Sequence, residues 1–97
     1  MKKSDLINAI SEETGVEKNT VRKVIETYTE LVKKSLINGE TVHFRGFGSF
    51  MLKYRRPKKG RIILRNETIL IPGHYIPSFK PADEFVKLIK ESVKNKE

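Results

Sequence analysis

The chain has 97 residues, enough for one small domain with a lean core, and its formal net charge of +8 predicts a polyanionic partner, nucleic acid or an anionic membrane surface. The absence of cysteine excludes a disulfide scaffold and a thiolate metal site. No apolar run approaches the roughly 18 residues of a membrane span, and Met1 is not followed by a signal-peptide core. We therefore expect an intracellular, cytoplasmic protein.

Helical periodicity predicts two helices in the first part of the chain. Ser4 is the expected N-cap of a first helix, which Thr14 and Gly15 close. A second helix is expected from residue 17 or 18 to the turn at residues 38–39, because apolar residues recur along one stripe and charged residues occupy the other side.

From Thr41 the apolar period changes to two, which predicts strands. Residues 41–44 and 50–54 are expected to form a hairpin that bends at residues 46–48. Residues 75–79 return to the core. The sequence thus predicts a single α+β domain over residues 1–97.

A final helix is expected next. Pro81 suits its first turn, where a missing backbone N–H costs nothing. Asp83 and Glu84 suit its positive N-terminal end.

Between the hairpin and the return strand we expect a protruding β-ribbon. Residues 61–64 face residues 68–71 across a turn at residues 65–67. Pro57 and Pro72 bracket this ribbon, and since proline cannot donate a ladder hydrogen bond, both suit an edge or a kink at the base of an arm.

The ribbon is cationic, and no acidic residue lies between Thr41 and Asn66. Cations spaced along a ribbon neutralise phosphates and release counterions, which predicts salt-sensitive duplex binding with weak sequence preference. Lys3, near the start of the chain, and Lys80, before the last helix, are candidates for flanking phosphates. The candidate DNA-binding residues of the ribbon are Lys53, Arg55, Arg56, Lys58, Lys59, Arg61 and Arg65.

No catalytic constellation is visible, so we do not expect an enzyme, a cofactor or a small-molecule substrate. His43 is expected at the edge of the core and His74 on the surface. Neither histidine has a partner at metal-ligand spacing, so no metal is expected.

Several segments resemble one known family. Residues 46–50, Gly-Phe-Gly-Ser-Phe, resemble the Gly-Phe-Gly-x-Phe signature of the bacterial histone-like DNA-bending proteins HU and IHF. Residues 59–61 are similar to that family's entry into the arm, residues 77–81 to its return strand and the start of its last helix, and residues 6–10 to its opening.

The resemblance implies an IHF-like fold with two N-terminal helices, a three-stranded antiparallel sheet with a protruding arm over about residues 55–74, and a C-terminal helix. It implies an intertwined homodimer, or a heterodimer with a paralogue, whose arms enter the minor groove of nucleoid DNA and bend it. The dimer core is expected around Phe44, Phe47, Phe50 and Phe79.

One departure concerns the tip of the arm. The family carries Asn-Pro there, with the proline wedged between base pairs, whereas the matching positions here are Ile62 and Ile63. Apolar side chains can also unstack a base step, so Ile63 is the candidate intercalating wedge.

Two alternatives stay open at this point. Residues 10–25 are similar to a helix-turn-helix, in which Lys18, Asn19 and Arg22 would contact base edges in the major groove with sequence specificity. The apolar arm also suits a protein-interaction module that pairs with the edge of another protein's sheet.

Overall fold

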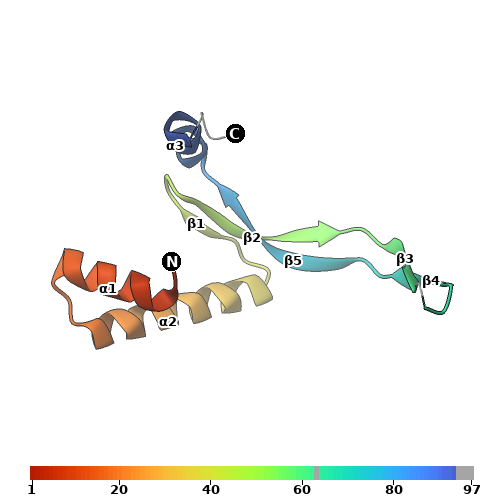
Figure 1. The fold of residues 1–97 in the computed structure, drawn as a ribbon, viewed down its shortest axis with the longest axis horizontal. Helices are drawn as coiled ribbons and strands as arrows, with labels where there is room; N and C mark the ends of the chain where they lie inside the picture. The colour runs from red at the N-terminus through yellow and green to blue at the C-terminus, as the bar shows by residue number, and fades with distance from the viewer. Residues whose placement is uncertain (63, 94–97) are drawn as a thin grey trace.

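The computed structural model describes residues 1–62 and 64–93. Its radius of gyration is 19.1 Å, against about 13 Å for a compact chain of this length. Figure 1 shows the reason: the two N-terminal helices, the last helix and a long ribbon extend from a central sheet in different directions. The elements are α1 (Lys3–Thr14), α2 (Lys18–Ile37), β1 (Val42–Phe44), β2 (Gly48–Arg55), β3 (Lys58–Ile62), β4 (Glu67–Ile71), β5 (His74–Pro81) and α3 (Asp83–Val93).

The first helix begins earlier than the sequence predicted. The backbone N–H of Lys2 donates to Asp5 Oδ2 at 2.9 Å, so the helix starts at Lys3 and Ser4 lies inside the first turn, not at the cap. Gly15 ends α1 in the left-handed region, at φ 74°, and its N–H donates to the Ser11 carbonyl. The predicted bounds of α2 are confirmed.

The central sheet has the strand order β1-β2-β5, and all pairs are antiparallel. Phe47 N–H donates to the Phe44 carbonyl at 3.0 Å and closes the β1–β2 turn, so the bend spans residues 45–47 and β2 already begins at Gly48. The predicted three-stranded sheet with a protruding arm is confirmed.

The arm is a second, two-stranded sheet in register with the first. Arg55 pairs with His74 at the end of one ladder, and Lys58 pairs with Ile71 at the start of the next. Two residues on each strand lie between, which puts Pro57 opposite Pro72. Neither proline has an N–H to donate to a ladder, and the pairing is interrupted at this point, between the three-stranded sheet and the two-stranded arm.

Two boundaries near the arm and the last helix differ from the prediction. The outgoing strand of the arm is Lys58–Ile62, not residues 61–64, and Leu64 lies in the tip turn, because pairing of Ile62 with Glu67 fixes the register. Pro81 ends β5 and does not open α3. Ala82 N–H donates to the Phe47 carbonyl at 2.9 Å, which holds the chain to the sheet until α3 begins.

Candidate nucleic-acid interface

An aromatic cluster joins the helices to the sheet. Phe47 and Phe50 each lie 5.1 Å from Phe79, centroid to centroid, and Phe44 lies 6.2 Å from Phe50. Tyr28 of α2 packs against Phe44 at 5.6 Å. The four phenylalanines predicted as a dimer core are therefore brought together within one subunit.

Gly48 allows this cluster to close. A Cβ at this position would lie 2.6 Å from the Lys80 carbonyl oxygen and would also collide with the Phe79 ring. Its φ of 158° adds a backbone conformation that other residues rarely adopt. Glycine is thus required here so that β2 and β5 can approach beneath the ring.

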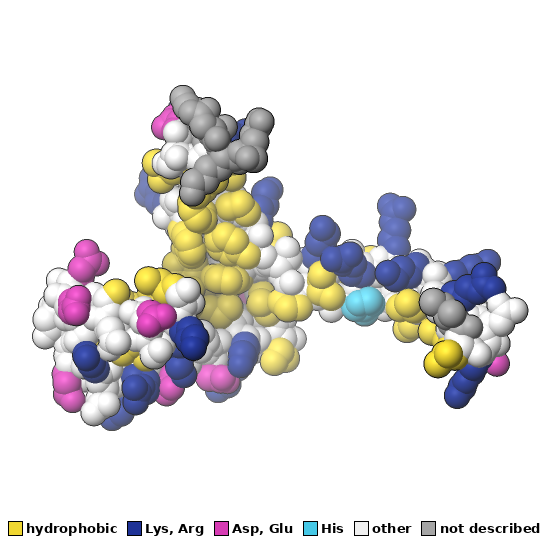
Figure 2. All heavy atoms as spheres, in the orientation of Figure 1, with side chains coloured by type: hydrophobic (Ala, Val, Ile, Leu, Met, Phe, Trp, Pro, Cys, Tyr) yellow, Lys and Arg dark blue, Asp and Glu magenta, His cyan; other side chains and the backbone are white. Residues whose placement is uncertain are grey.

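Every cation predicted for DNA contact on the ribbon is exposed. Among residues 1–62 and 64–93, the ion pairs are Lys3 with Glu26 and Lys33 with Glu30, so none of these arm cations is neutralised by a carboxylate there. One is held in place by a neutral group, since the Arg61 guanidinium donates to Asn66 Oδ1. Figure 2 shows the lysine and arginine side chains along the arm, while acidic side chains gather mainly on the two-helix part.

Strand alternation divides these cations between faces. On β2, Lys53 and Arg55 alternate with Leu52 and Tyr54, and they share their face with Ser49. On the arm, Lys59 and Arg61 lie on one face. Lys58 lies on the other, which also carries Ile62, Ile69 and Ile71 through the cross-strand pairs. The arm therefore has a cationic face and a more apolar face.

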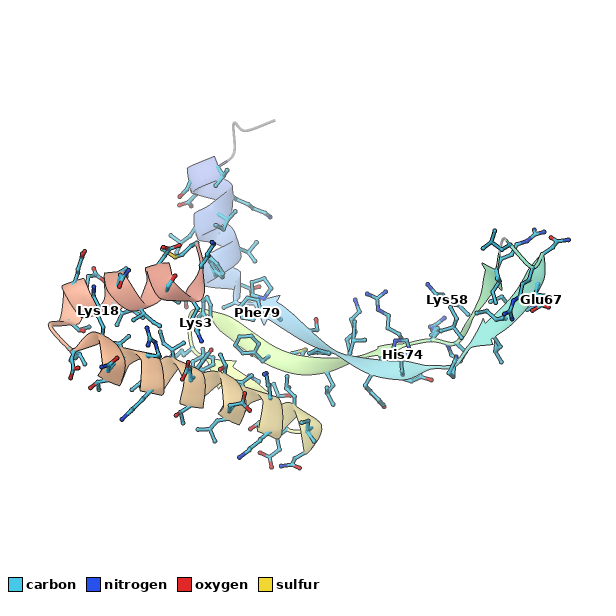
Figure 3. The ribbon with its side chains drawn as sticks, turned by 60° about the horizontal axis from the view of Figure 1, so that its bottom comes forward. Lys3, Lys18, Lys58, Glu67, His74 and Phe79 are labelled. Carbon is cyan, nitrogen blue, oxygen red and sulfur yellow. The ribbon has the colours of Figure 1, made fainter. Side chains whose placement is uncertain are left out.

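The base of the arm is hollowed. A hollow of about 550 Å³ beside Pro57 is lined by Arg55, Arg56, Lys58 and His74, together with Ile71 and Ile76. Figure 3 places Lys58 and His74 between the sheet and the tip, where Glu67 lies. Three cations converge at the break between the two sheets, so the interrupted ladder is also the most densely charged part of the ribbon.

The two remaining predicted cations lie away from the arm. Lys80 is exposed on β5 and pairs across the sheet with Ser49. Lys3 Nζ is 3.0 Å from Glu26 Oε2 and joins α1 to α2, so it must leave this pair before it can bind a phosphate.

Sequence reasoning missed a second hollow, of about 560 Å³, at the end of the sheet opposite the arm. Arg45, Lys80 and Asp83 line it, together with His43 and Ser49. His43 was expected at the core edge, but it is exposed because Val42 and Phe44 take the inner face of β1. Arg45 lies in the same stretch without acidic residues as the arm cations, and this position in the sequence could have identified it as a further candidate for DNA contact.

A sequence profile of the family described as "Bacterial DNA-binding protein" matches residues 1–93. The chain belongs to this family. It is 34% identical to integration host factor subunit beta of Saccharophagus degradans, over 98% of each chain. It is 38% identical to the same subunit of Colwellia psychrerythraea, over 96% of this chain and 99% of that one. DNA-binding protein HU of Geobacillus stearothermophilus is 34% identical, over 97% of this chain and all of its own length.

Solved structures show the same HU-type fold. An Anabaena HU–DNA cocrystal structure matches with a TM-score of 0.87 at 29% identity, over 92% of this chain and 97% of that one. HU from Thermotoga maritima matches with a TM-score of 0.65 at 26% identity, over 93% of this chain and its full length. The resemblance noted from residues 46–50 is therefore confirmed over nearly the whole chain.

Three expectations from the sequence can now be compared with the family and with the structure. The helix pair at residues 3–37 does contain a short turn at residues 15–17, but this pair is the helical part of the HU fold and not a separate repressor motif. Ile63, the candidate wedge, lies outside the described residues. No helix within residues 1–62 and 64–93 has the length and apolar character needed to cross a membrane.

Proposed function

We propose that this protein is a histone-like architectural protein of the bacterial nucleoid, and hence of the cytoplasm, which binds duplex DNA with little sequence specificity and bends it. The observation that carries this proposal is the exposed cationic ribbon, free of carboxylate partners among the described residues. The likeness to an HU chain crystallised with DNA supports the same partner. The family consists of DNA-binding proteins, so we propose neither a catalytic activity nor a cofactor.

The arm is the proposed grip on the duplex. Its cations are spaced along two strands, which suits a series of backbone phosphates, and phosphate contacts fix position without reading sequence. If half of the seven ribbon cations in each of two subunits contact phosphates, the log-log dependence of affinity on salt has a slope of roughly −6.

A homodimer is the proposed binding unit. In one subunit only Ile7, Val21 and Leu36 are buried apolar side chains among the described residues, while Leu31 of α2 and Leu88 of α3 are 57% and 60% exposed. An open groove of about 430 Å³ between β5 and α3 is lined by Phe79, Phe85 and neighbouring apolar residues. A single chain of 97 residues in this open shape buries few apolar side chains. Contact with a second copy would bury the apolar faces of α2, β5 and α3 and so provide a larger core.

The wedge assignment for Ile63 rests on sequence position and on the use of apolar side chains by minor-groove proteins to unstack base steps. It predicts that Ile63→Ala lowers the bend angle of a duplex labelled for energy transfer at both ends. Leu70→Ala, which removes an exposed apolar side chain further down the arm, is the matched control. An unchanged angle in the Ile63 variant would remove this residue from the bending mechanism.

Gel shift on several unrelated duplexes at two salt concentrations tests the proposed function. We expect similar affinities for all sequences and a steep loss of binding at the higher salt concentration. A strong preference for one sequence would contradict the low sequence specificity proposed here. Failure to bind any duplex at low salt would leave a protein-interaction module as the better account.

Light scattering tests the proposed homodimer. A monomer at micromolar concentration would contradict it.

A further inference from the structure

The face of the sheet that carries Lys53 and Arg55 continues past the core to the hollow at its far end. Cross-strand partners share a face, and one row of partners runs from His43 through Ser49 to Lys80. This row lies on the same side of β2 as Lys53 and Arg55, opposite the phenylalanines. A duplex laid along this face from the arm would reach the hollow.

The row contains a direct contact. His43 Nδ1 and Ser49 Oγ are 2.8 Å apart, and both groups open on the hollow of about 560 Å³. His43 and Lys80 are exposed, and Ser49 is half-buried, so the imidazole and hydroxyl are positioned by each other while they stay accessible. An imidazole, a hydroxyl and an ammonium in one concave site are donors that suit a phosphate group.

The charges around this hollow nearly cancel when His43 is neutral. Arg45 and Lys80 contribute the positive charges, and Asp83 lines the same hollow from the start of α3. Glu84 lies beside Gly46, where a Cβ would be 3.2 Å from its Oε2. Protonation of His43 therefore turns a nearly balanced site into a cationic one.

We propose that His43, Ser49 and Lys80 form a phosphate-binding site for the DNA backbone which is switched on by protonation of His43. This inference rests on the proposed function and adds a regulated contact to it.

Protonation acts on the serine as well as on the charge. In the neutral imidazole Nδ1 can accept the Ser49 hydroxyl proton, which turns that proton away from the hollow. In the imidazolium both nitrogens are donors, so Nδ1–H donates to Ser49 Oγ and the hydroxyl proton is free for a phosphate oxygen. One proton thus supplies a charge and redirects a second donor.

Duplex affinity measured by fluorescence anisotropy at about pH 7.5 and about pH 5.5 tests the proposal, because histidine is the side chain that ordinarily changes charge in this range. We expect several-fold tighter binding at the lower pH, and the two His43 side chains of a dimer should steepen the salt slope by about 1.8. His43→Gln should remove this share of the response and Ser49→Ala should reduce it.

His74→Gln is the matched control, since the chain contains two histidines and His74 lies at the base of the arm. Protonation of His74 would also add a cation beside the arm cations, so this variant measures the share of the response that comes from the arm. A response as large in His43→Gln as in the unaltered protein would overturn the proposal. Equal affinity of the unaltered protein at both pH values would also overturn it, while leaving the proposed function intact. Absence of duplex binding at either pH would instead refute the proposed function itself.

The source of the phosphate is tested with NMR of the His43 ring at the lower pH. The ring resonances should shift when duplex is added, and they should shift much less with inorganic phosphate at the same concentration of phosphate groups and the same ionic strength. Equal shifts with duplex and with inorganic phosphate would overturn the assignment to the DNA backbone.

Discussion

The sheet and the arm are one continuous antiparallel register, yet they are stabilised in different ways. From Gly48 to Met51 the ribbon is buried or half-buried at the aromatic cluster and α2, whereas beyond Pro57 the described strands of the arm pair with each other and are mostly exposed. The same antiparallel pairing therefore forms a packed base, which is the three-stranded sheet with its aromatic cluster, and then an exposed arm. Side-chain packing stabilises the base, and the charge of the arm suits it to bind a polyanion.

The largest expected effect on stability comes from removing a ring of the base. Phe79 contacts Phe47 and Phe50, so Phe79→Ala should lower the free energy of unfolding by about 3 kcal/mol. Leu70→Ala, on the exposed arm, should change it by less than about 0.5 kcal/mol. Urea unfolding at one fixed protein concentration measures both. Equal losses would show that the arm is packed as the base is.

A glycine substitution sharpens the contrast. Gly48→Ala places a methyl group against the Lys80 carbonyl, which cannot move without breaking the sheet, so we expect a loss of about 2 kcal/mol. Gly60→Ala meets the end of the Ile71 side chain at 3.0 Å, which can rotate away, and should cost less than about 1 kcal/mol. Thermal unfolding compares the two variants, and the reverse order would contradict the assignment of rigid and yielding contacts.

The next prediction concerns the interruption of the hydrogen-bond ladder between the base and the arm. Replacing Pro57 and Pro72 together with threonine restores two backbone N–H donors at facing positions. We expect slower amide hydrogen exchange at residues 55–58 and 71–74 and a change in global stability below about 1 kcal/mol. Exchange as fast as in the unaltered protein would show that the prolines do not cause the interruption.

The smallest effect is expected on the helical part. The Lys3–Glu26 pair joins α1 to α2, but its side chains are 58% and 50% exposed. Glu26→Gln should therefore cost less than about 1 kcal/mol in urea unfolding. It should also free Lys3 and raise duplex affinity slightly, as measured by anisotropy. A large loss of stability would show that this pair is more than a surface contact.

Much of this architecture could be predicted from the sequence because its signals are local. The helical period gave the bounds of α2, and the Gly-Phe-Gly turn located the sheet. The N-cap error at Ser4 is local, because Lys2 N–H finds Asp5 three residues on, whereas the errors in the strands arose where partners distant in sequence decide the outcome. The start of β3 depends on pairing with Ile71, and the end of β5 depends on the Phe47 carbonyl.

The same reason explains what was found and missed at the candidate site. The arm cations follow one another along the chain, so their density is visible in the sequence. His43, Ser49 and Lys80 come from three strands and meet only through the register of the sheet.

The central claim is that the arm, and not the helix pair, binds the duplex. It is tested most directly by the affinity of two matched variants for one random-sequence duplex at low salt. In the first, Arg55, Arg56, Lys58 and Arg61 are all changed to glutamine. In the second, the same change is made at Lys18, Arg22, Lys23 and Lys33 of α2. We expect near-complete loss of binding in the arm variant and a small loss in the helix variant. Intact binding by the arm variant would contradict the account.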